Sequence, residues 1–457
     1  MSLTPAGIAD VAADVRSGRR GAQEVLEGYL ERVDALNPEL NAVVSLRADA
    51  ARSDARRLDA RIRSGEPVGA LAGIPFTVKD VIATDDLPTT CGSVVMKGHR
   101  PSADAAVVSL LRSAGAILVG KTNTPEFAFG VDTVNDLFGR TNNPLGPWTP
   151  GGSSGGEAAA VAAGMSAFGV GTDFGGSIRW PAQCTGLVGL RPTVGLVSNA
   201  GVLPASRNDG LDTPDVRTLQ GRVQVVGPLA RTVADLEAVL RVVAAGDQAV
   251  SAHGAVPMSR VDIRWGTTVS GHAVDPDVAA AVESAVESLG RAGAGTVEGL
   301  PSSLDEAAGL YSELRAIDPL AEIRDAAAGR EEELGALSRS LLLDAAEGTP
   351  SADVVRSLWA AREDLCTALA QWLHGDRLLA LPVATTAPFD PAEPGTGGFD
   401  LVTPSRAVAL FGLPAISVPC GRTAGGAPLS VQLVAPAFRE DLLFSAARVL
   451  EQAGPRS

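Results

Sequence analysis

The spacing of hydrophobic positions changes along the chain, and each spacing predicts a different kind of element. In the first 65 residues apolar side chains recur three or four positions apart, as at Val11 and Val15, which is typical of amphipathic helices. The apolar run IPFTVKDVI predicts a buried strand that ends near Lys79. The segment AVVSLLRSAGAILVG predicts a helix that stops at Gly115 and leads directly into a strand. This alternation predicts an α/β sheet covered by helices on both faces.

The second half of the chain is predicted to be largely helical until near its end. RTVADLEAVLRVVAAG predicts a helix, VDIRWGTTV a strand, and Val274–Ala292 an amphipathic helix. Residues 303–378 are rich in Ala, Leu, Glu and Arg at helical periodicity and predict a helical layer. LPAISVPCG and APLSVQLVAP then predict two strands, followed by a last helix from Arg439.

Composition and charge exclude several classes of protein. The chain has 457 residues, 45% of them hydrophobic and 20% charged, which is enough for a large buried core. Its net charge of −15 predicts an acidic surface that repels phosphate backbones, so no nucleic acid partner is expected. The longest charge-poor stretch, Ala158–Thr172, is too short and too rich in glycine to span a bilayer. Met1–Arg20 has no apolar core of the length of a signal peptide, so no integral membrane segment is expected.

The pattern of cysteines and histidines favours neither disulfide bonds nor a metal site. The four cysteines lie far apart without CxxC spacing, which indicates buried thiols in a reducing, cytoplasmic setting. Four histidines without an HExxH motif or a nearby nucleophile motif favour neither a metal site nor a His-dependent triad. By contrast, 35 of the 38 basic residues are arginine, and the three lysines are Lys79, Lys97 and Lys121. In a chain so rich in arginine, a lysine can serve as an amine that loses its proton, can form a structural ion pair as an ammonium, or can be present by chance.

Two glycine-rich segments carry the remaining candidate chemistry. GGSSGGEAAAVAAG, Gly151–Gly164, resembles a phosphate-binding loop but lacks the GK[ST] ending, so it is either a capped helix start or part of another site. In GTDFGGSIRWPA, two glycines precede Ser177, an arrangement that suits either a tight turn or an oxyanion hole beside a nucleophile. A serine hydroxyl needs a base, and a desolvated Lys79 can serve in place of histidine, with Ser153 between them as a hydroxyl relay.

These segments together resemble the amidase signature family. The resemblance rests on Lys79 in GIPFTVKD, on GGSSGG and on GTDFGGSIR, and extends to LRSAGAILVGKTNTPEF, FGRTNNP, GLVGLRPTVG, GPLARTVADL and GLPAISVPCG. It implies one large α/β fold over residues 1–457, with a mixed central sheet covered on both faces by helices. Residues 1–65 would be N-terminal helices, 66–240 the signature core, about 300–395 a variable helical region, and 400–457 a return to the core sheet.

The resemblance also implies roles for individual residues. Ser177 would be the nucleophile, Ser153 would follow a cis peptide bond and relay the proton, and Lys79 would be the base. The backbone amides of Phe174, Gly175, Gly176 and Ser177 would form the oxyanion hole. The residues expected to support this network are Ser154, Thr172, Asp173 and Arg179. Ala128, Phe129 and Gly130 would lie along the acyl pocket, and with Phe127 they hint at an apolar or aromatic acyl group. No cofactor and no metal is implied.

The resemblance implies an amidase that converts a small carboxamide to a carboxylic acid and ammonia or an amine, and a homodimer is compatible with it. An alternative is the glutamine-hydrolysing subunit of an amidotransferase complex. In such subunits an Asp upstream of GLPAIS helps to bind glutamine, and here Val402 stands near that position. A third alternative is a non-catalytic relative that serves only for interaction. Trp148 is expected either to pack or to line the substrate entrance.

Overall fold

A computed structural model describes residues 7–203, 217–244, 254–346, 350–393 and 397–454, and it is built around one large sheet. Eleven strands form this sheet, and a separate two-stranded ribbon, β4 (Val134–Asn135) with β5 (Gly139–Arg140), lies outside it. The order across the sheet is β1 (Val43–Leu46), β3 (Ile117–Thr122), β2 (Pro75–Lys79), β6 (Phe168–Asp173), β8 (Val225–Ala230), β7 (Val188–Arg191), β12 (Ala415–Arg422), β13 (Pro428–Val434), β11 (Arg377–Pro382), β9 (Asp262–Trp265) and β10 (Gly295–Glu298).

The sheet is mixed, and helices cover both of its faces, which confirms the expected fold class. β2 runs parallel to β3 and β6, whereas β8 runs antiparallel to β6 and β7. The helices packed on one face are α4 (Ala106–Ser113), α8 (Val233–Val243), α10 (Pro276–Arg291) and α16 (Glu440–Ala453). The helices packed on the other face are α5 (Gly155–Ala162) and α6 (Arg179–Thr185).

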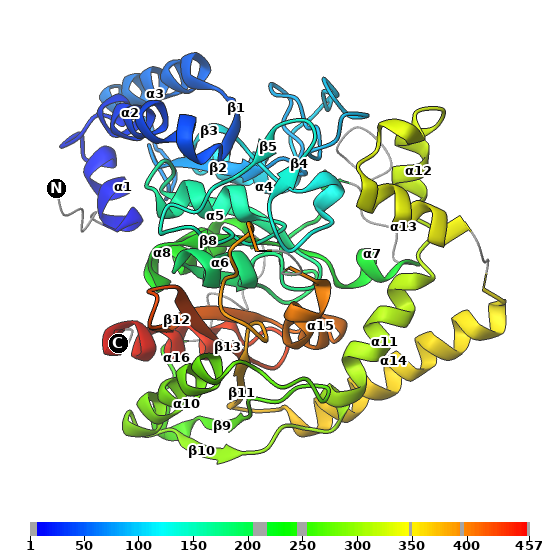
Figure 1. The fold of residues 1–457 in the computed structure, drawn as a ribbon. Helices are drawn as coiled ribbons and strands as arrows, with labels where there is room; N and C mark the ends of the chain where they lie inside the picture. Colours follow the sequence, from blue (N-terminus) through cyan, green and yellow to red (C-terminus); the bar gives the residue numbers. More distant parts are fainter. Residues whose placement is uncertain (1–6, 204–216, 245–253, 347–349, 394–396, 455–457) are drawn as a thin grey trace.

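The N-terminal region is helical as predicted, with one strand that the hydrophobic spacing did not indicate. α1 (Ile8–Arg16), α2 (Ala22–Leu40) and α3 (Ala48–Arg63) lie together in the blue part of Figure 1. β1 separates α2 from α3 and adds an antiparallel strand at the edge of the sheet beside β3. Four residues in which only the first is buried are too few to show a period of two in the sequence.

The predicted helical region between residues 303 and 378 is confirmed and lies to one side of the sheet, in yellow-green and yellow in Figure 1. Its helices are α11 (Ser303–Ala316), α12 (Ala321–Ala327), α13 (Ala336–Ala346) and α14 (Ala352–Trp372). α11 packs against α14, against α7 (Leu219–Val223) and against α15 (Thr403–Leu410), the helix that precedes the predicted strands β12 and β13. The variable region is therefore anchored to the sheet through α15.

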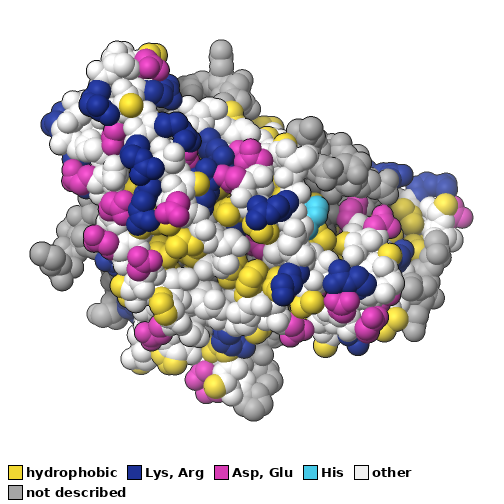
Figure 2. Space-filling view, turned by 90° about the horizontal axis from the view of Figure 1, so that it is seen from above, with side chains coloured by type: hydrophobic (Ala, Val, Ile, Leu, Met, Phe, Trp, Pro, Cys, Tyr) yellow, Lys and Arg dark blue, Asp and Glu magenta, His cyan; other side chains and the backbone are white. Residues whose placement is uncertain are grey.

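Charged side chains on the surface are mixed rather than segregated by sign. Figure 2 shows basic and acidic side chains interspersed over the surface that α2 and α3 form, and Arg52 of α3 pairs with Glu27 of α2 at 2.9 Å. Among the described residues, no helix has both the length and the apolar character needed to cross a membrane.

The two strands at the centre of the site separate an apolar face from a polar one. Phe76 of β2 and Phe168 of β6 stack with ring centroids 5.4 Å apart in the core on one face. The alternate positions of the same strands face α5, because successive side chains of a strand point to opposite faces. There Thr77 donates a hydrogen bond to Glu157 of α5, and Gly169 leaves the space that the Glu157 side chain occupies.

Glycine lets the start of α5 lie directly against the end of β3. A Cβ atom at Gly156 would stand 2.4 Å from the carbonyl oxygen of Asn123 and 2.5 Å from its nitrogen. Both distances are far shorter than real Cβ atoms show, and the backbone of Asn123 cannot rotate out of the way as a side chain could. The GGSSGG motif therefore brings the backbone of α5 against the strand end.

We expect Gly156→Ala to lower the free energy of unfolding by about 1–3 kcal/mol, because α5 must shift from Asn123. Gly28→Ala is the matched control, since Gly28 is exposed within α2 and a Cβ there meets nothing within 4 Å. That control should raise the stability by up to about 1 kcal/mol through helix propensity. Thermal unfolding of both variants measures the difference. Equal midpoints for Gly156→Ala and the wild type would show that the close approach is unimportant.

Candidate functional site

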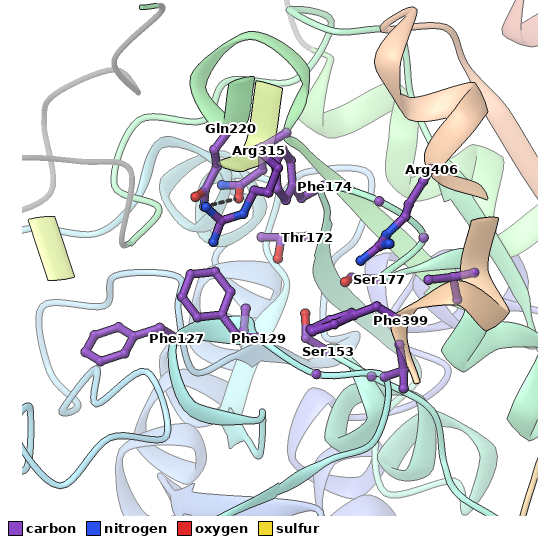
Figure 3. Close-up of a pocket in the computed structure, with 18 of the residues that line it drawn as sticks. Phe127, Phe129, Ser153, Thr172, Phe174, Ser177, Gln220, Arg315, Phe399 and Arg406 are labelled. Atoms are coloured by element: carbon purple, nitrogen blue, oxygen red, sulfur yellow. Dashed lines mark hydrogen bonds between the residues drawn. The ribbon is translucent and has the colours of Figure 1, made fainter. Parts of the chain in front are cut away.

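A cavity of about 150 Å³ opens at the ends of β2 and β6, and all three predicted catalytic segments meet beside it. Figure 3 shows Ser153 and Ser177 next to one another on this cavity, with Thr172 close by. The residues that line it are Phe127, Ala128, Phe129, Gly130, Val131, Gly152, Ser153, Thr172, Phe174, Gly175, Gly176, Ser177, Gln220, Gln224, Tyr311, Arg315, Leu341, Phe399, Val402 and Arg406.

Lys79 is the last residue of β2, and its side chain is completely buried. Its Nζ donates hydrogen bonds to Ser153 Oγ at 2.6 Å and to Thr172 Oγ1 at 2.9 Å. Among the described residues no carboxylate lies within 4 Å of it. Burial lowers the pKa of Lys79 to about 7, while the charges of Asp173 and Glu157 act in the opposite direction. The amine can therefore lose its proton near neutral pH.

Ser153 and Ser154 belong to the turn that enters α5. The peptide bond between Gly152 and Ser153 is cis, as the resemblance implied. Ser153 is 1% exposed and accepts the hydrogen bond from Lys79, so its Oγ lies where a neutral Lys79 amine could take up its hydroxyl proton. Ser154 Oγ donates to the carbonyl oxygen of Thr172 at 3.3 Å, and the Ser154 amide donates to the carbonyl oxygen of Ser177 at 3.2 Å. These bonds hold the two serine loops together.

Ser177 lies in the turn between β6 and α6, and the carboxylate of Asp173 organises that turn. The amides of Gly176 and Ile178 donate to this carboxylate at 2.9 and 3.2 Å. Arg179 donates to both of its oxygens, and Arg191 pairs with it at 3.3 Å. Burial alone raises the pKa of Asp173, but the charges of Arg179 and Arg191 hold it well below its usual range.

Three of the four amides expected to form the oxyanion hole have no acceptor. Among the described residues, the amides of Phe174, Gly175 and Ser177 make no hydrogen bond. The Gly176 amide is already engaged by Asp173, so in this structure it shapes the turn and is not free to bind an oxyanion. Gly176 has φ +121°, a conformation that disfavours other residues, and a Cβ there would stand 2.8 Å from Ser405.

The structure places Ala128, Phe129 and Gly130 on the cavity wall, together with Phe127. Val402 lies on the same cavity, so the position where glutamine-hydrolysing subunits were expected to have an Asp is apolar at this site. Trp148 does not line this cavity; it borders two other surface hollows with Pro147 and Phe389. Of the two expectations for Trp148, packing fits the structure, since its ring lies against Gly146, and lining this cavity does not.

Two buried charges beneath the site were missed by the sequence analysis. Glu157 accepts hydrogen bonds from Thr77 and Thr122, and burial raises its pKa to about 8. The sequence did carry a signal for Glu157, because an acidic residue inside an Ala- and Gly-rich helix start is unusual. Arg191 in GLRPT is equally buried and joins the Asp173 network.

Several polar and aromatic cavity residues come from the later part of the chain, where the sequence carried no signal for them. These are Tyr311 and Arg315 of α11, Phe399, and Arg406 of α15. They reach the cavity through the packing of α11 against α15, which no local pattern predicts. Across the described residues, no group of three His, Cys, Asp or Glu side chains is placed to hold a metal ion.

Comparisons with known proteins agree on the family. Curated relatives include a protein of Trichodesmium erythraeum named as a glutamyl-tRNA(Gln) amidotransferase subunit, which is 34% identical over 98% of each chain. A protein of the same name from Myxococcus xanthus is 36% identical over 99% of this chain and 98% of its own. Among solved structures, a 6-aminohexanoate cyclic dimer hydrolase with substrate has a TM-score of 0.84 at 28% identity, covering 99% of this chain and 97% of its own.

A peptide amidase from Stenotrophomonas maltophilia is also similar in structure, with a TM-score of 0.79 at 29% identity, covering 99% of this chain and 98% of its own. The family model described as Amidase matches residues 24–444, which is most of the chain. The motifs around the cavity fall within that match. The chain therefore belongs to the amidase signature family, and it is an enzyme that acts on amide C–N bonds.

Proposed function

We propose that this enzyme hydrolyses a small carboxamide to a carboxylic acid and ammonia or an amine, through an acyl-enzyme on Ser177. The observation that carries this proposal is the buried amine of Lys79, 2.6 Å from Ser153 Oγ, beside a cavity that Ser153 and Ser177 share. A neutral lysine with a hydroxyl partner is a general base, and the shared cavity is where the reacting carbonyl would lie.

In the first half of the reaction, Lys79 accepts the hydroxyl proton of Ser153 while Ser153 accepts the proton of Ser177. Ser177 Oγ then attacks the amide carbonyl carbon, and the carbonyl π electrons move onto the oxygen. The free amides of Phe174, Gly175 and Ser177 are positioned to donate to that oxyanion. Thr172, which also accepts from Lys79, holds the amine in line with Ser153.

In the second half, the proton returns through Ser153 to the leaving nitrogen, and the C–N bond breaks. A water molecule loses a proton to the same relay and attacks the ester carbonyl, which releases the acid and restores Ser177. Asp173 and Arg179 keep the nucleophile turn rigid, and Ser154 ties it to the Ser153 turn. This scheme uses only side chains and backbone of the chain itself.

A second candidate function is glutamine hydrolysis within an amidotransferase complex. The names of the curated relatives favour it, at 34–36% identity over nearly the full chain. The cavity favours the first candidate, because Val402 is apolar and no described residue that lines the cavity is acidic. A glutamine bound there would find no carboxylate for its α-ammonium group.

We expect a fluorophosphonate to form one covalent adduct on the wild-type enzyme and none on Ser177→Ala, measured by intact mass. Ser153→Ala should label about 10²–10⁴-fold more slowly, because it removes the proton relay. Ser198→Ala, a change of an exposed serine, is the control and should label like the wild type. No adduct on a folded wild-type protein would contradict a self-sufficient hydrolase and favour the amidotransferase candidate.

We expect kcat/KM for amide hydrolysis to rise with pH through about 7 and then level off. The active form of Lys79 is the neutral amine, and burial places its pKa near 7, so protonation below that pH removes the base. Lys79→Arg keeps the charge but cannot lose its proton, and should reduce kcat/KM by at least about a hundredfold at every pH. A rate that stays constant between pH 5 and 9 would exclude Lys79 as the base.

A further inference from the structure

Two arginines line the cavity, each from a different helix. Arg315 comes from α11 and Arg406 from α15. Tyr311 stands four residues before Arg315, so both side chains lie on the same face of α11. Arg406 lies over the Tyr311 ring, 5.6 Å from its centroid. Figure 3 shows the Arg406 side chain pointing toward Ser177, whereas the guanidinium group of Arg315 lies near Gln220 and Phe129.

Arg406 and Tyr311 approach the nucleophile turn closely. A Cβ atom at Gly175 would stand 2.7 Å from Tyr311 Oη and 3.1 Å from Arg406 Cγ, so these side chains pack directly on the turn that carries Ser177. Arg315 lies over the Phe129 ring at 4.9 Å, and Arg406 over Phe399 at the same distance. Aromatic faces thus hold both cations at the cavity wall.

Neither guanidinium has an anionic partner. In the part of the chain that the structure describes, neither side chain makes an ion pair or donates a hydrogen bond, and Arg315 Nη2 is buried without an acceptor. The two fully buried arginines of the site differ, since Arg179 and Arg191 share the carboxylate of Asp173. Arg315 and Arg406 are partly buried, and charges removed from water are normally paired in proteins, so their lack of an anionic partner among the described residues is unusual.

The two charges also repel one another. Burial lowers the pKa of Arg406, and the nearby charge of Arg315 lowers it further, while Tyr311 and Asp400 act in the opposite direction. Asp400 is exposed, borders a different hollow, and is not within ion-pair distance of Arg406. An anion in the cavity would remove this repulsion and supply the missing acceptors.

We propose that the substrate amide carries a carboxylate, which Arg315 and Arg406 bind while the amide carbonyl meets Ser177. Two guanidinium groups match the planar geometry of a carboxylate, and the apolar wall at Phe127 and Phe129 would contact the carbon chain between the two ends. The expectation of a purely apolar acyl group from those phenylalanines is therefore incomplete. Since no acidic side chain among the described residues lines the cavity, an amic acid fits better than a zwitterion such as glutamine.

This proposal rests on amide hydrolysis at Ser177, and the substrates that test it differ only in charge. The probes are the ω-amic acids from malonamate to suberamate, each with its uncharged methyl ester, and L-glutamine, which is glutaramate with an added α-amino group. Ammonia release gives kcat/KM for each. We expect at least one amic acid to exceed its own ester by about 30-fold or more, and glutaramate to exceed glutamine.

Arginine variants separate recognition of the carboxylate from a structural role. Arg406→Gln and Arg315→Gln should each lower kcat/KM for the preferred amic acid by about 30-fold or more, mainly through KM. The loss on the amic acid should exceed the loss on the matching ester by about tenfold or more, since the ester has no charge for the arginine to bind. Arg356→Gln, an exposed position on α14, is the matched control and should change neither. Equal losses on acid and ester would overturn the proposal, as would an ester preferred throughout the series.

A binding measurement distinguishes failure of this proposal from failure of the hydrolase function. Ser177→Ala cannot form an acyl-enzyme but keeps both arginines, so calorimetry with the amic acids reports carboxylate binding without turnover. Binding of an amic acid but not of its ester, abolished by Arg406→Gln in the same background, supports the carboxylate site even if no probe is hydrolysed. Absence of binding throughout the series, in a wild-type enzyme that still reacts with fluorophosphonate, overturns the carboxylate site and leaves the hydrolase proposal standing.

Discussion

The site depends on one lysine amine that is buried without a counter-ion. Lys79 Nζ has two hydroxyl partners, Ser153 and Thr172, and no carboxylate at ion-pair distance among the described residues. Moving an ammonium from water into such surroundings is costly, and this cost is what lowers the pKa to about 7. A carboxylate in direct contact would have stabilised the ammonium and removed the base. The acidic groups nearby are kept apart from Lys79: Glu157 by its two threonine donors and Asp173 by its two arginines.

The position of Ser153 beside Lys79 depends on close backbone packing at glycine positions, where any side chain would clash. Gly156 permits α5 to meet the end of β3, and Gly171 leaves room for Ser154 between α5 and β6. The Asp173 carboxylate then closes the next turn by accepting from Gly176 and Ile178. The two serine turns are thus fixed against the sheet, which would preorganise the hydroxyl relay that we propose.

The cavity has two walls of different origin, which we call the reacting side and the selecting side. The reacting side is built by β2, β6 and the turns before α5 and α6, all within the segment that resembles the family most closely. The selecting side is built by α11 and α15, which pack against one another beyond the sheet. Arg315 and Arg406 belong to the selecting side, and neither bonds to Lys79. In the function that we propose, the reacting side supplies the chemistry and the selecting side recognises the charge of the substrate.

The sequence by itself determined the α/β fold class, the position of the central strands and the residues that meet at the site. Lys79, Ser153 and Ser177 lie in motifs that resemble the amidase signature family, and this resemblance, rather than any local pattern, predicted that they meet. The edge strand β1 was missed because four residues show no periodicity, and the sequence left two places open for Trp148 because an aromatic side chain carries no directional signal. Only the tertiary structure revealed that the Gly176 amide is already engaged, that Glu157 lies beneath the lysine, and that two unpaired arginines face the cavity. The reason is physical: a local motif encodes backbone geometry, whereas the partners and the dielectric surroundings of a charge depend on elements far away in the chain.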